Sequence, residues 1–256
     1  MIRLEETTVF GWESAIRGMR NPMNSWDKSD SGRCNILNEI TDENASYRCA
    51  GCKNEYVSEE CIVIGENDLA LMKKLSKAGS DHAKFLRMIN VTVDITAPRY
   101  WWIEFDTYKI GTVANSCSTM HKIHEKEFAL DDFSCEHMEM LGYGEKTMYE
   151  NTKLFLRDIV EWLNCNRTEF LILKDKIKNT SDIEERKELE VLAKKYWWQM
   201  IQLLPQSYNQ KRTVQMNYQV LKNMYFARIN HKLDEWKTFC KWCESLPYFK
   251  EVVINE

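Results

Sequence analysis

Between His82 and His121 the sequence passes from a strand pattern to a helix pattern and then to a small, polar loop. From Phe85 to Ile95 the odd positions are apolar and the even positions mostly polar, which is the period of a half-buried strand. Pro98 suits the first turn of a helix because its missing N–H would have no partner there, so we expect a helix from Pro98 to Asp106. The loop after it is built of small residues that let backbone approach a ligand.

Two further helices are indicated by apolar residues at helical spacing. The first runs from Glu66 to Gly79, with Asn67 placed to cap its start and Gly79 placed to end it. The second begins at Ser181 and Glu184, which have the spacing of a capping box, and ends before Pro205. Its apolar stripe consists of Leu189, Leu192, Tyr196, Met200 and Leu203.

The carboxy-terminal part predicts a strand followed by two helices. Lys211 to Met216 alternates like a short strand, and Asn217 is placed to cap a helix that has Arg228 near its end. The expected buried face of that helix is Val220, Leu221, Met224 and Tyr225. A last helix, from about His231 to Ser245, directs Leu233, Trp236, Phe239 and Cys243 toward a core.

Composition limits the class of protein. A chain of 256 residues, 44% of them hydrophobic, is long enough for a sizeable core, and we expect one domain spanning 1–256. No run reaches the roughly 18 to 20 uncharged apolar residues of a membrane span, and the amino terminus lacks a signal-peptide pattern, so we expect a cytoplasmic protein without membrane partners. A net charge of -4 argues against a general nucleic-acid binder.

The cysteines are expected to be reduced thiols because their number is odd and no secretion signal is present. They are Cys34, Cys49, Cys52, Cys61, Cys117, Cys135, Cys165, Cys240 and Cys243. Four thiolates from two CxxC pairs would satisfy a zinc ion, but one pair lies on a predicted helix, and we therefore predict no metal site. His121 and His124 lie in a polar stretch and are interpreted as surface residues.

Positive charge flanks the strand-to-helix turn at Asn217. Lys211 and Arg212 precede this turn, and Arg228 follows one helix later. A helix start offers free N–H groups and the positive end of the helix dipole, both of which suit an anion. Solvated surface charges are the alternative interpretation of these residues.

The segment LPQSYNQKRTVQMNYQVLKNMYFAR, from Leu204 to Arg228, resembles the carboxy-terminal pattern of the flavin-dependent thymidylate synthases, the ThyX family. The resemblance extends from about Trp12 to Trp236. It implies that Lys211 contacts the nucleotide phosphate, that Asn217 and Asn223 contact the flavin, and that Arg228 grips dUMP. Upstream, GSDHAKF resembles the family's Glu-His-x-x-Phe motif. The resemblance implies that His82 lies at the face of the site that binds flavin and folate.

The family's Arg-His-Arg triplet falls on Thr107, Tyr108 and Lys109, of which only Lys109 keeps a charge. The resemblance places Tyr108 and Lys109 at the cofactor. Arg99 and Arg212, together with Lys109, are possible replacements for the lost charge.

The family's Ser-x-Arg signature falls on the segment NSCSTMH. The later Arg corresponds to Thr119, or to Met120 if one residue is inserted. The serine that meets the pyrimidine corresponds to Cys117 or, with the insertion, to Ser118, which we prefer; the insertion also places Asn115 at the nucleotide.

Glu104 stands where the family has a nucleotide-contacting Gln, and a carboxylate there would alter substrate preference. The resemblance implies an α+β fold with a central, mostly antiparallel sheet flanked by helices. It also implies a homotetramer that binds FAD and uses NADPH and methylenetetrahydrofolate to methylate dUMP or a related pyrimidine nucleotide, with Ser118 and Arg228 as catalytic residues. The alternative is a ThyX-fold protein that has lost catalysis and serves as a nucleotide-binding or assembly module.

Overall fold

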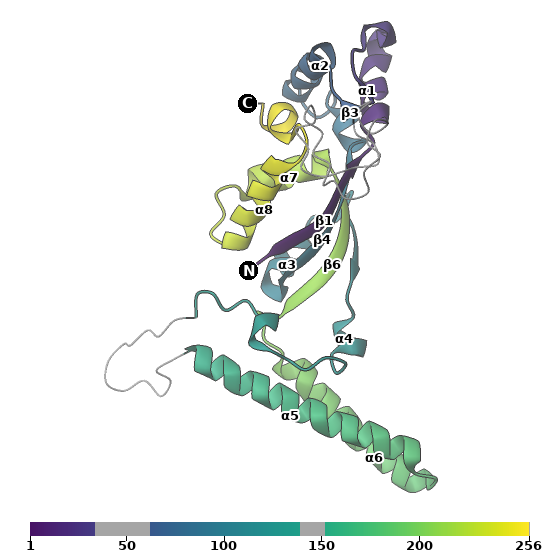
Figure 1. Ribbon diagram of the computed structural model, residues 1–256, viewed down its shortest axis with the longest axis vertical. Coiled ribbons are helices and arrows are strands. Elements are labelled where there is room, and N and C mark those ends of the chain that lie inside the picture. The colour runs from purple at the N-terminus through teal and green to yellow at the C-terminus, as the bar shows by residue number, and fades with distance from the viewer. Residues whose placement is uncertain (34–61, 139–151, 256) are drawn as a thin grey trace, which may run out of the picture. The chain divides into compact units, whose positions relative to one another are not determined.

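The computed structural model describes residues 1–33, 62–138 and 152–255 (Figure 1). The described chain combines helices with a four-stranded antiparallel sheet of order β1-β4-β6-β5, so the expected mixture of helices and an antiparallel sheet is confirmed. Two compact units share the chain. The first contains Met1, Thr96–Glu104 and Ser116–Lys211, and the second contains Ile2–Ile95, Phe105–Asn115 and Arg212–Glu256.

The elements that precede the second gap begin with the amino-terminal strand and helix. In chain order they are β1 (Arg3–Phe10), α1 (Trp12–Arg20), short 3-10 turns at Asn21–Met23 and Trp26–Lys28, β2 (Gly32–Arg33), β3 (Ile62–Val63), α2 (Glu66–Lys77), a 3-10 turn at Lys84–Arg87, β4 (Asn90–Pro98), α3 (Arg99–Phe105), β5 (Val113–Ser116), α4 (Thr119–Lys122) and a 3-10 turn at Leu130–Asp132. The remaining elements are α5 (Thr152–Asn179), α6 (Ile183–Leu203), β6 (Asn209–Asn217), α7 (Tyr218–Arg228), α8 (Asp234–Ser245) and a π-helical turn at Lys250–Ile254.

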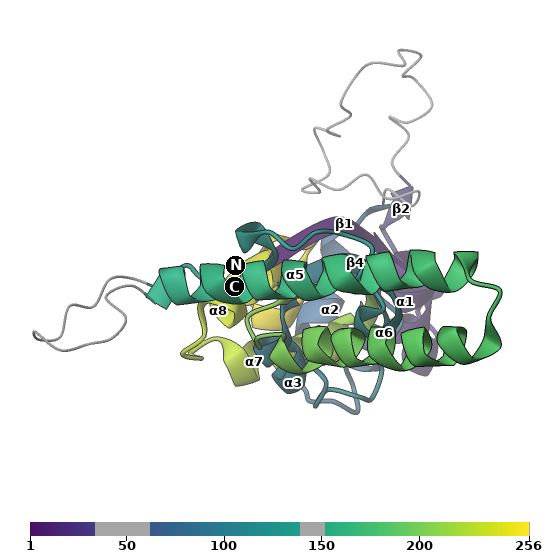
Figure 2. The same ribbon diagram turned by 90° about the horizontal axis from the view of Figure 1, so that it is seen from below.

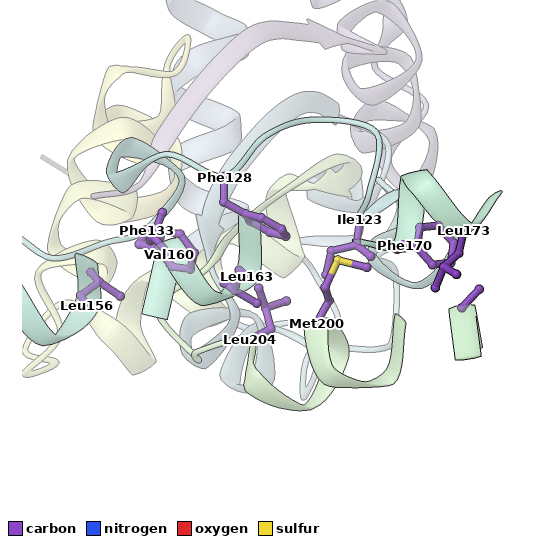
Figure 3. Close-up of a cluster of buried hydrophobic side chains, with 11 residues drawn as sticks. Ile123, Phe128, Phe133, Leu156, Val160, Leu163, Phe170, Leu173, Met200 and Leu204 are labelled. Carbon is purple, nitrogen blue, oxygen red and sulfur yellow. The ribbon is translucent and has the colours of Figure 1, made fainter. Parts of the chain in front are cut away.

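The first unit is built on a hairpin of the long helices α5 and α6, which lie side by side (Figure 2). The segment after α4 lies on the hairpin and contributes Ile123, Phe128 and Phe133 to its core. The helices contribute Leu163 and Met200, both fully buried, among the side chains drawn in Figure 3. Burial of several large apolar side chains along one line stabilises the hairpin, at roughly 1.5 to 3 kcal/mol for each fully buried one.

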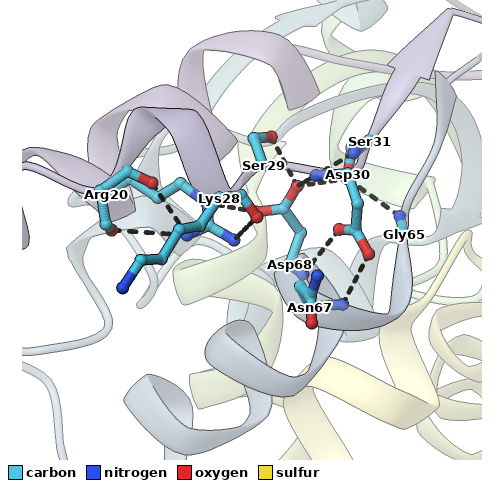
Figure 4. Close-up of polar contacts among 9 residues, drawn as sticks. Arg20, Lys28, Ser29, Asp30, Ser31, Gly65, Asn67 and Asp68 are labelled. Carbon is cyan, nitrogen blue, oxygen red and sulfur yellow. Dashed lines mark hydrogen bonds and ion pairs between the residues drawn. The ribbon is translucent and has the colours of Figure 1, made fainter.

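The second unit has a buried polar network near its amino terminus (Figure 4). Arg20 donates from Nε to the Asp68 carboxylate at 2.6 Å, and both side chains are almost fully buried. The other Asp68 oxygen accepts from the hydroxyls of Ser29 and Ser31, each at 2.7 Å. Burial alone would raise the pKa of Asp68, but these hydrogen bonds and the Arg20 charge outweigh it, so the pKa lies below its ordinary value.

Several predicted boundaries need correction. The strand expected from Phe85 begins at Asn90, and Lys84–Arg87 is a 3-10 turn in which the adjacent residues Phe85 and Leu86 are both buried, so the alternation predicted from Phe85 does not hold there. The polar loop before Cys117 contains the edge strand β5. The strand expected at 211–216 is longer, from Asn209 to Asn217.

The helix caps differ from expectation at two places. Gly65 is the N-cap of α2 in place of Asn67, and the Asp30 carboxylate accepts from the Asn67 and Asp68 backbone N–H groups. Asp182, not Ser181, caps α6 by accepting from the first helical N–H groups. The stripe predicted on α6 is confirmed in part. Leu189, Tyr196 and Met200 pack in the core of the hairpin, whereas Leu192 and Leu203 are exposed.

Three predicted elements are confirmed closely. The helix expected from Pro98 is α3, the helix after Asn217 is α7 with its predicted face buried, and the last helix is α8. Trp236, Phe239 and Cys243 are fully buried, as expected.

Candidate functional site

The predicted site residues are divided between the two units. Glu104, Ser118 and Lys211 belong to the first unit. The second contains His82, Tyr108, Lys109, Asn115, Asn217, Asn223 and Arg228. Each group has its own geometry.

Arg228, the last residue of α7, lies between two aromatic side chains of the second unit. Its Nε donates to the Tyr108 hydroxyl at 2.9 Å. Its guanidinium carbon is 5.5 Å from the centre of the Tyr108 ring and 4.8 Å from the centre of the Trp236 ring. The rings meet edge to face, with centroids 6.2 Å apart. Such cation–π contacts and the hydrogen bond restrict the orientation of a side chain that otherwise has many rotamers.

Trp236 itself is held firmly. It is fully buried at the start of α8, and its ring contacts His231 and Phe239, with centroids at 6.3 and 5.5 Å. Sequence reasoning identified Trp236 as a core residue but missed its contact with Arg228. The contact of Arg228 with Tyr108 gives no local signal either, because these two residues are 120 positions apart in the sequence.

The segment from Tyr108 to Gly111 follows α7 in the reverse direction. Tyr108 contacts the last residue of the helix, whereas Gly111 lies at its start. A Cβ on Gly111 would come within 2.9 Å of a Val220 methyl and 3.4 Å of the Asn217 amide nitrogen. Gly111 also has φ +76, which favours glycine. Lys109 and Ile110 between them are exposed, and Ile110 is 92% accessible.

Asn217 has the structural role predicted for it. Its Oδ1 accepts from the Val220 N–H at 3.0 Å and so caps α7. The amide nitrogen of the same side chain lies beside the backbone of Gly111. Asn223 lies one turn along the exposed side of α7 and accepts from Gln219 at 3.0 Å.

Two other predicted residues of the second unit, His82 and Asn115, are exposed. His82 follows α2, and its backbone N–H donates to Gly79 O. Asn115 lies in the exposed strand β5. Arg212 donates to the Asp106 carboxylate at 2.7 Å, so this possible replacement for a lost signature arginine already has an anionic partner.

In the first unit, backbone contacts join the Ser118 loop to the start of β6. The Cys117 N–H donates to Lys211 O at 3.0 Å, and Gln210 donates from its side chain to Cys117 O and to the Thr119 hydroxyl. The Ser118 hydroxyl accepts from the His121 N–H and caps the short helix α4. Sequence reasoning missed Gln210, although it directly precedes Lys211.

Three further side chains of the first unit bear on the predictions. Glu104 is half-buried, and the Lys211 side chain is exposed. His124 is half-buried against Phe170, with ring centroids 4.8 Å apart, so its interpretation as a surface residue needs correction. Burial, and the nearby Lys174 charge to a smaller degree, lower the pKa of His124.

Within residues 1–33, 62–138 and 152–255, no group of three or more His, Cys, Asp or Glu side chains is arranged to hold a metal ion. Burial raises the pKa of Cys240 to about 11 and raises the pKa of Cys243 well above its ordinary value, so these thiols stay protonated at neutral pH. Cys34, Cys49, Cys52 and Cys61 lie outside the described residues. In the same described ranges no helix is both long enough and apolar enough to span a membrane.

No protein-family model and no curated protein matches this sequence. Two solved structures of thymidylate synthase X (ThyX) from Helicobacter pylori, each with FAD and dUMP, are similar to this chain in fold. One is 15% identical and covers 100% of this chain and 98% of its own, with a TM-score of 0.55. The other is 17% identical and covers 98% and 99%, also with a TM-score of 0.55. This chain therefore has a ThyX-like fold.

Proposed function

We propose that this protein is an FAD-dependent, thymidylate synthase-like enzyme that methylates dUMP or a related pyrimidine nucleotide with methylenetetrahydrofolate and NADPH. The observation that carries the proposal is the fixed guanidinium of Arg228 on α7, at the position that matches the family's dUMP-gripping arginine. The ThyX-like fold supports it, because the neighbours with that fold were solved with FAD and dUMP.

We propose nucleotide contacts for Arg228 and Asn115 in the second unit and for Lys211, Glu104 and Ser118 in the first. An oriented guanidinium is a good anion ligand because its fork of N–H donors matches the oxygens of a phosphate or a carbonyl edge. Ser118 and Arg228 would also stabilise the reacting pyrimidine by hydrogen bonding.

The residues near the start of α7 fit a flavin. The exposed backbone at Gly111 and the amide nitrogen of Asn217 lie together there, so a flat ring can approach main chain without meeting a bulky side chain. We assign Asn217, Asn223, His82 and Lys109 to flavin binding. The family resemblance also implies a cofactor contact for Tyr108. Because its hydroxyl accepts a hydrogen bond from Arg228 Nε, we propose that Tyr108 acts at the nucleotide by orienting this arginine. When bound, FAD supplies the hydride chemistry, and the protein supplies alignment and charge stabilisation.

The alternative function is a ThyX-fold module that binds a nucleotide without catalysis. One observation favours it: the Ser118 hydroxyl is already engaged as the cap of α4. The hydroxyl hydrogen of Ser118 can still donate, but the position of its oxygen is set by the α4 cap and not by a ligand.

The proposal extends to assembly and location. We propose a single functional domain that forms a homotetramer in the cytoplasm, with tryptophan-rich surfaces between copies.

The visible absorption spectrum of the purified protein tests the function. FAD is added, the protein is desalted, and NADPH is supplied with and without dUMP. Flavin bands that are retained and that bleach faster with dUMP are the expected result. A colourless protein that still binds dUMP by calorimetry would replace the enzyme with the nucleotide-binding module. A colourless protein that binds no dUMP would exclude both functions.

A further inference from the structure

Gln210, near the start of β6, holds the two residues that flank Ser118 in the chain. Its amide nitrogen donates to Cys117 O at 2.9 Å and to the Thr119 hydroxyl at 3.0 Å. An amide nitrogen carries two hydrogens, so this side chain directs both of its donors at one short segment. All four residues belong to the first unit. The backbone on either side of Ser118 is therefore tied to a single strand residue.

Gln210 can serve as an anchor because its own backbone is fixed. The indole N–H of Trp102, a fully buried residue of α3, donates to Gln210 O at 2.9 Å. At the next residue of β6, Lys211 O accepts from the Cys117 N–H at 3.0 Å. A side chain that extends from a fixed backbone has less freedom to lose when it forms its own hydrogen bonds. The anchor thus connects the buried core of the unit to the segment around Ser118.

Trp197 holds the following residue of the same segment from a different element. Its indole Nε1 donates to Met120 O at 2.9 Å. Trp197 lies on α6 and packs against the core of the α5–α6 hairpin, which restricts the orientation of its ring. The segment is therefore anchored to α6 as well as to β6.

These anchors determine where the Ser118 hydroxyl lies. Its oxygen accepts from the His121 N–H at 3.1 Å, and a hydroxyl that accepts can still donate its hydrogen to a ligand. A segment without anchors would have to be ordered each time a ligand binds, and the lost entropy would weaken binding. A donor that is already in place avoids this loss.

We propose that Gln210 and Trp197 are positioning residues for Ser118, and that they act on the nucleotide through its hydroxyl. The inference rests on the proposed function, because that function assigns a nucleotide contact to Ser118. It adds two residues that the family resemblance did not identify. Their acceptors are on Thr119 and Met120, the two positions at which the resemblance places the lost signature arginine.

Variants of the full-length protein that remove only the donors test the proposal. Gln210→Met keeps the length of the side chain, and Trp197→Phe keeps an aromatic ring. The matched controls are Gln202→Met and Trp198→Phe, at exposed positions of α6. We expect each donor variant to raise the Kd for dUMP, measured by calorimetry, by about fivefold, and each control to stay within about twofold of the wild type.

A double-mutant cycle shows whether the effect passes through Ser118. In a Ser118→Ala background, Gln210→Met and Trp197→Phe should each change the Kd for dUMP by less than about twofold, because the hydroxyl that they position is absent. A purely structural role would weaken binding by the same factor in both backgrounds. Circular dichroism checks the fold of every variant, and the two donor variants test the proposal independently.

The outcomes separate this inference from the proposed function. A wild-type protein that binds no dUMP would overturn both. A wild-type protein that binds dUMP, with donor variants that bind it equally well or that lose the same affinity in both backgrounds, would overturn the positioning roles alone. FAD retention after desalting, which these two residues do not govern, reports separately on the flavin chemistry.

Discussion

At the scale of single residues, Gly111 allows a test that separates backbone strain from steric contact. Gly111→Ala places a Cβ 2.9 Å from Val220 in a left-handed conformation, and we expect the free energy of unfolding to fall by roughly 2 to 3 kcal/mol. Gly79→Ala is the matched control, because Gly79 has φ +106 but open space around its Cβ, and it should lose only about 1 kcal/mol. Urea denaturation measures both. Equal losses of unfolding free energy in the two variants would mean that the contact between the new Cβ and Val220 does not destabilise the protein.

Asp68 links a single carboxylate to acid stability. Its pKa is lower in the folded chain than in the unfolded chain, so its contribution is complete above the unfolded value of about 3.9 and is lost as the pH falls through the lowered folded value. We expect Asp68→Asn to cost roughly 3 kcal/mol at pH 7, because Arg20 then stays buried beside a neutral partner.

Thermal unfolding between pH 7 and pH 3 measures this effect. The difference between wild type and Asp68→Asn should narrow as the pH falls below about 4, because protonation removes the same charge from the wild type. Glu190→Gln is the control, since Glu190 belongs to an exposed pair with Arg186 and should change stability little. A difference that is constant across this range would contradict the assigned role of the Asp68 charge.

Substitutions at Arg228 and Tyr108 test whether this pair of residues binds the nucleotide. Arg228→Ala should abolish dUMP binding, measured by calorimetry. Tyr108→Phe keeps the ring but removes the hydroxyl acceptor of Nε, and we expect the dissociation constant for dUMP to rise by about tenfold, because a hydrogen bond to a charged group contributes roughly 1.5 kcal/mol. The thermal midpoint of Tyr108→Phe should stay near that of the wild type. Unchanged dUMP affinity in this variant would show that Tyr108 does not orient the arginine.

At the scale of elements, Asn217 combines a helix cap with a proposed flavin contact, and two substitutions separate these roles. Asn217→Ala removes the cap of α7 and should cost about 1 kcal/mol of stability together with FAD affinity. Asn217→Ser keeps a capping oxygen but lacks the amide nitrogen, so stability should be retained while FAD affinity falls. If Asn217→Ser retains FAD as well as the wild type does, the amide has no part in cofactor binding.

The elements that were predictable from sequence are those with a strong local signal. The sequence predicts the start, the buried face and the end of α7, because Asn217 caps it, apolar residues recur at helical spacing after the cap, and Arg228 closes it. Pro98 likewise predicts the start of α3. The start of β4 was wrong because Phe85 and Leu86 are buried by neighbouring elements, which local alternation does not reveal. Helix α5 was missed because Phe155, Trp162 and Ile172 are apolar on its exposed side, and this blurs the helical period.

In the candidate site, too, the local sequence predicts the helix that carries a residue but not the partners of its side chain. Sequence placed Arg228 on its helix, but its partners Tyr108 and Trp236 come from segments whose approach depends on the path of the whole chain. Arg212, equally basic in sequence, is paired with Asp106 in the fold. Local pattern therefore locates a charge, whereas the tertiary contacts decide whether it is oriented for a ligand or neutralised by a neighbour.

At the scale of the whole molecule, the proposed homotetramer makes stability depend on protein concentration. Dilution favours the dissociated and less stable chain, because only the assembled copies gain the free energy of association. Between about 1 and 100 µM we expect the thermal midpoint of the wild type to rise by about 3 °C. Differential scanning fluorimetry across this range measures the rise, and a midpoint that is independent of concentration would contradict the homotetramer.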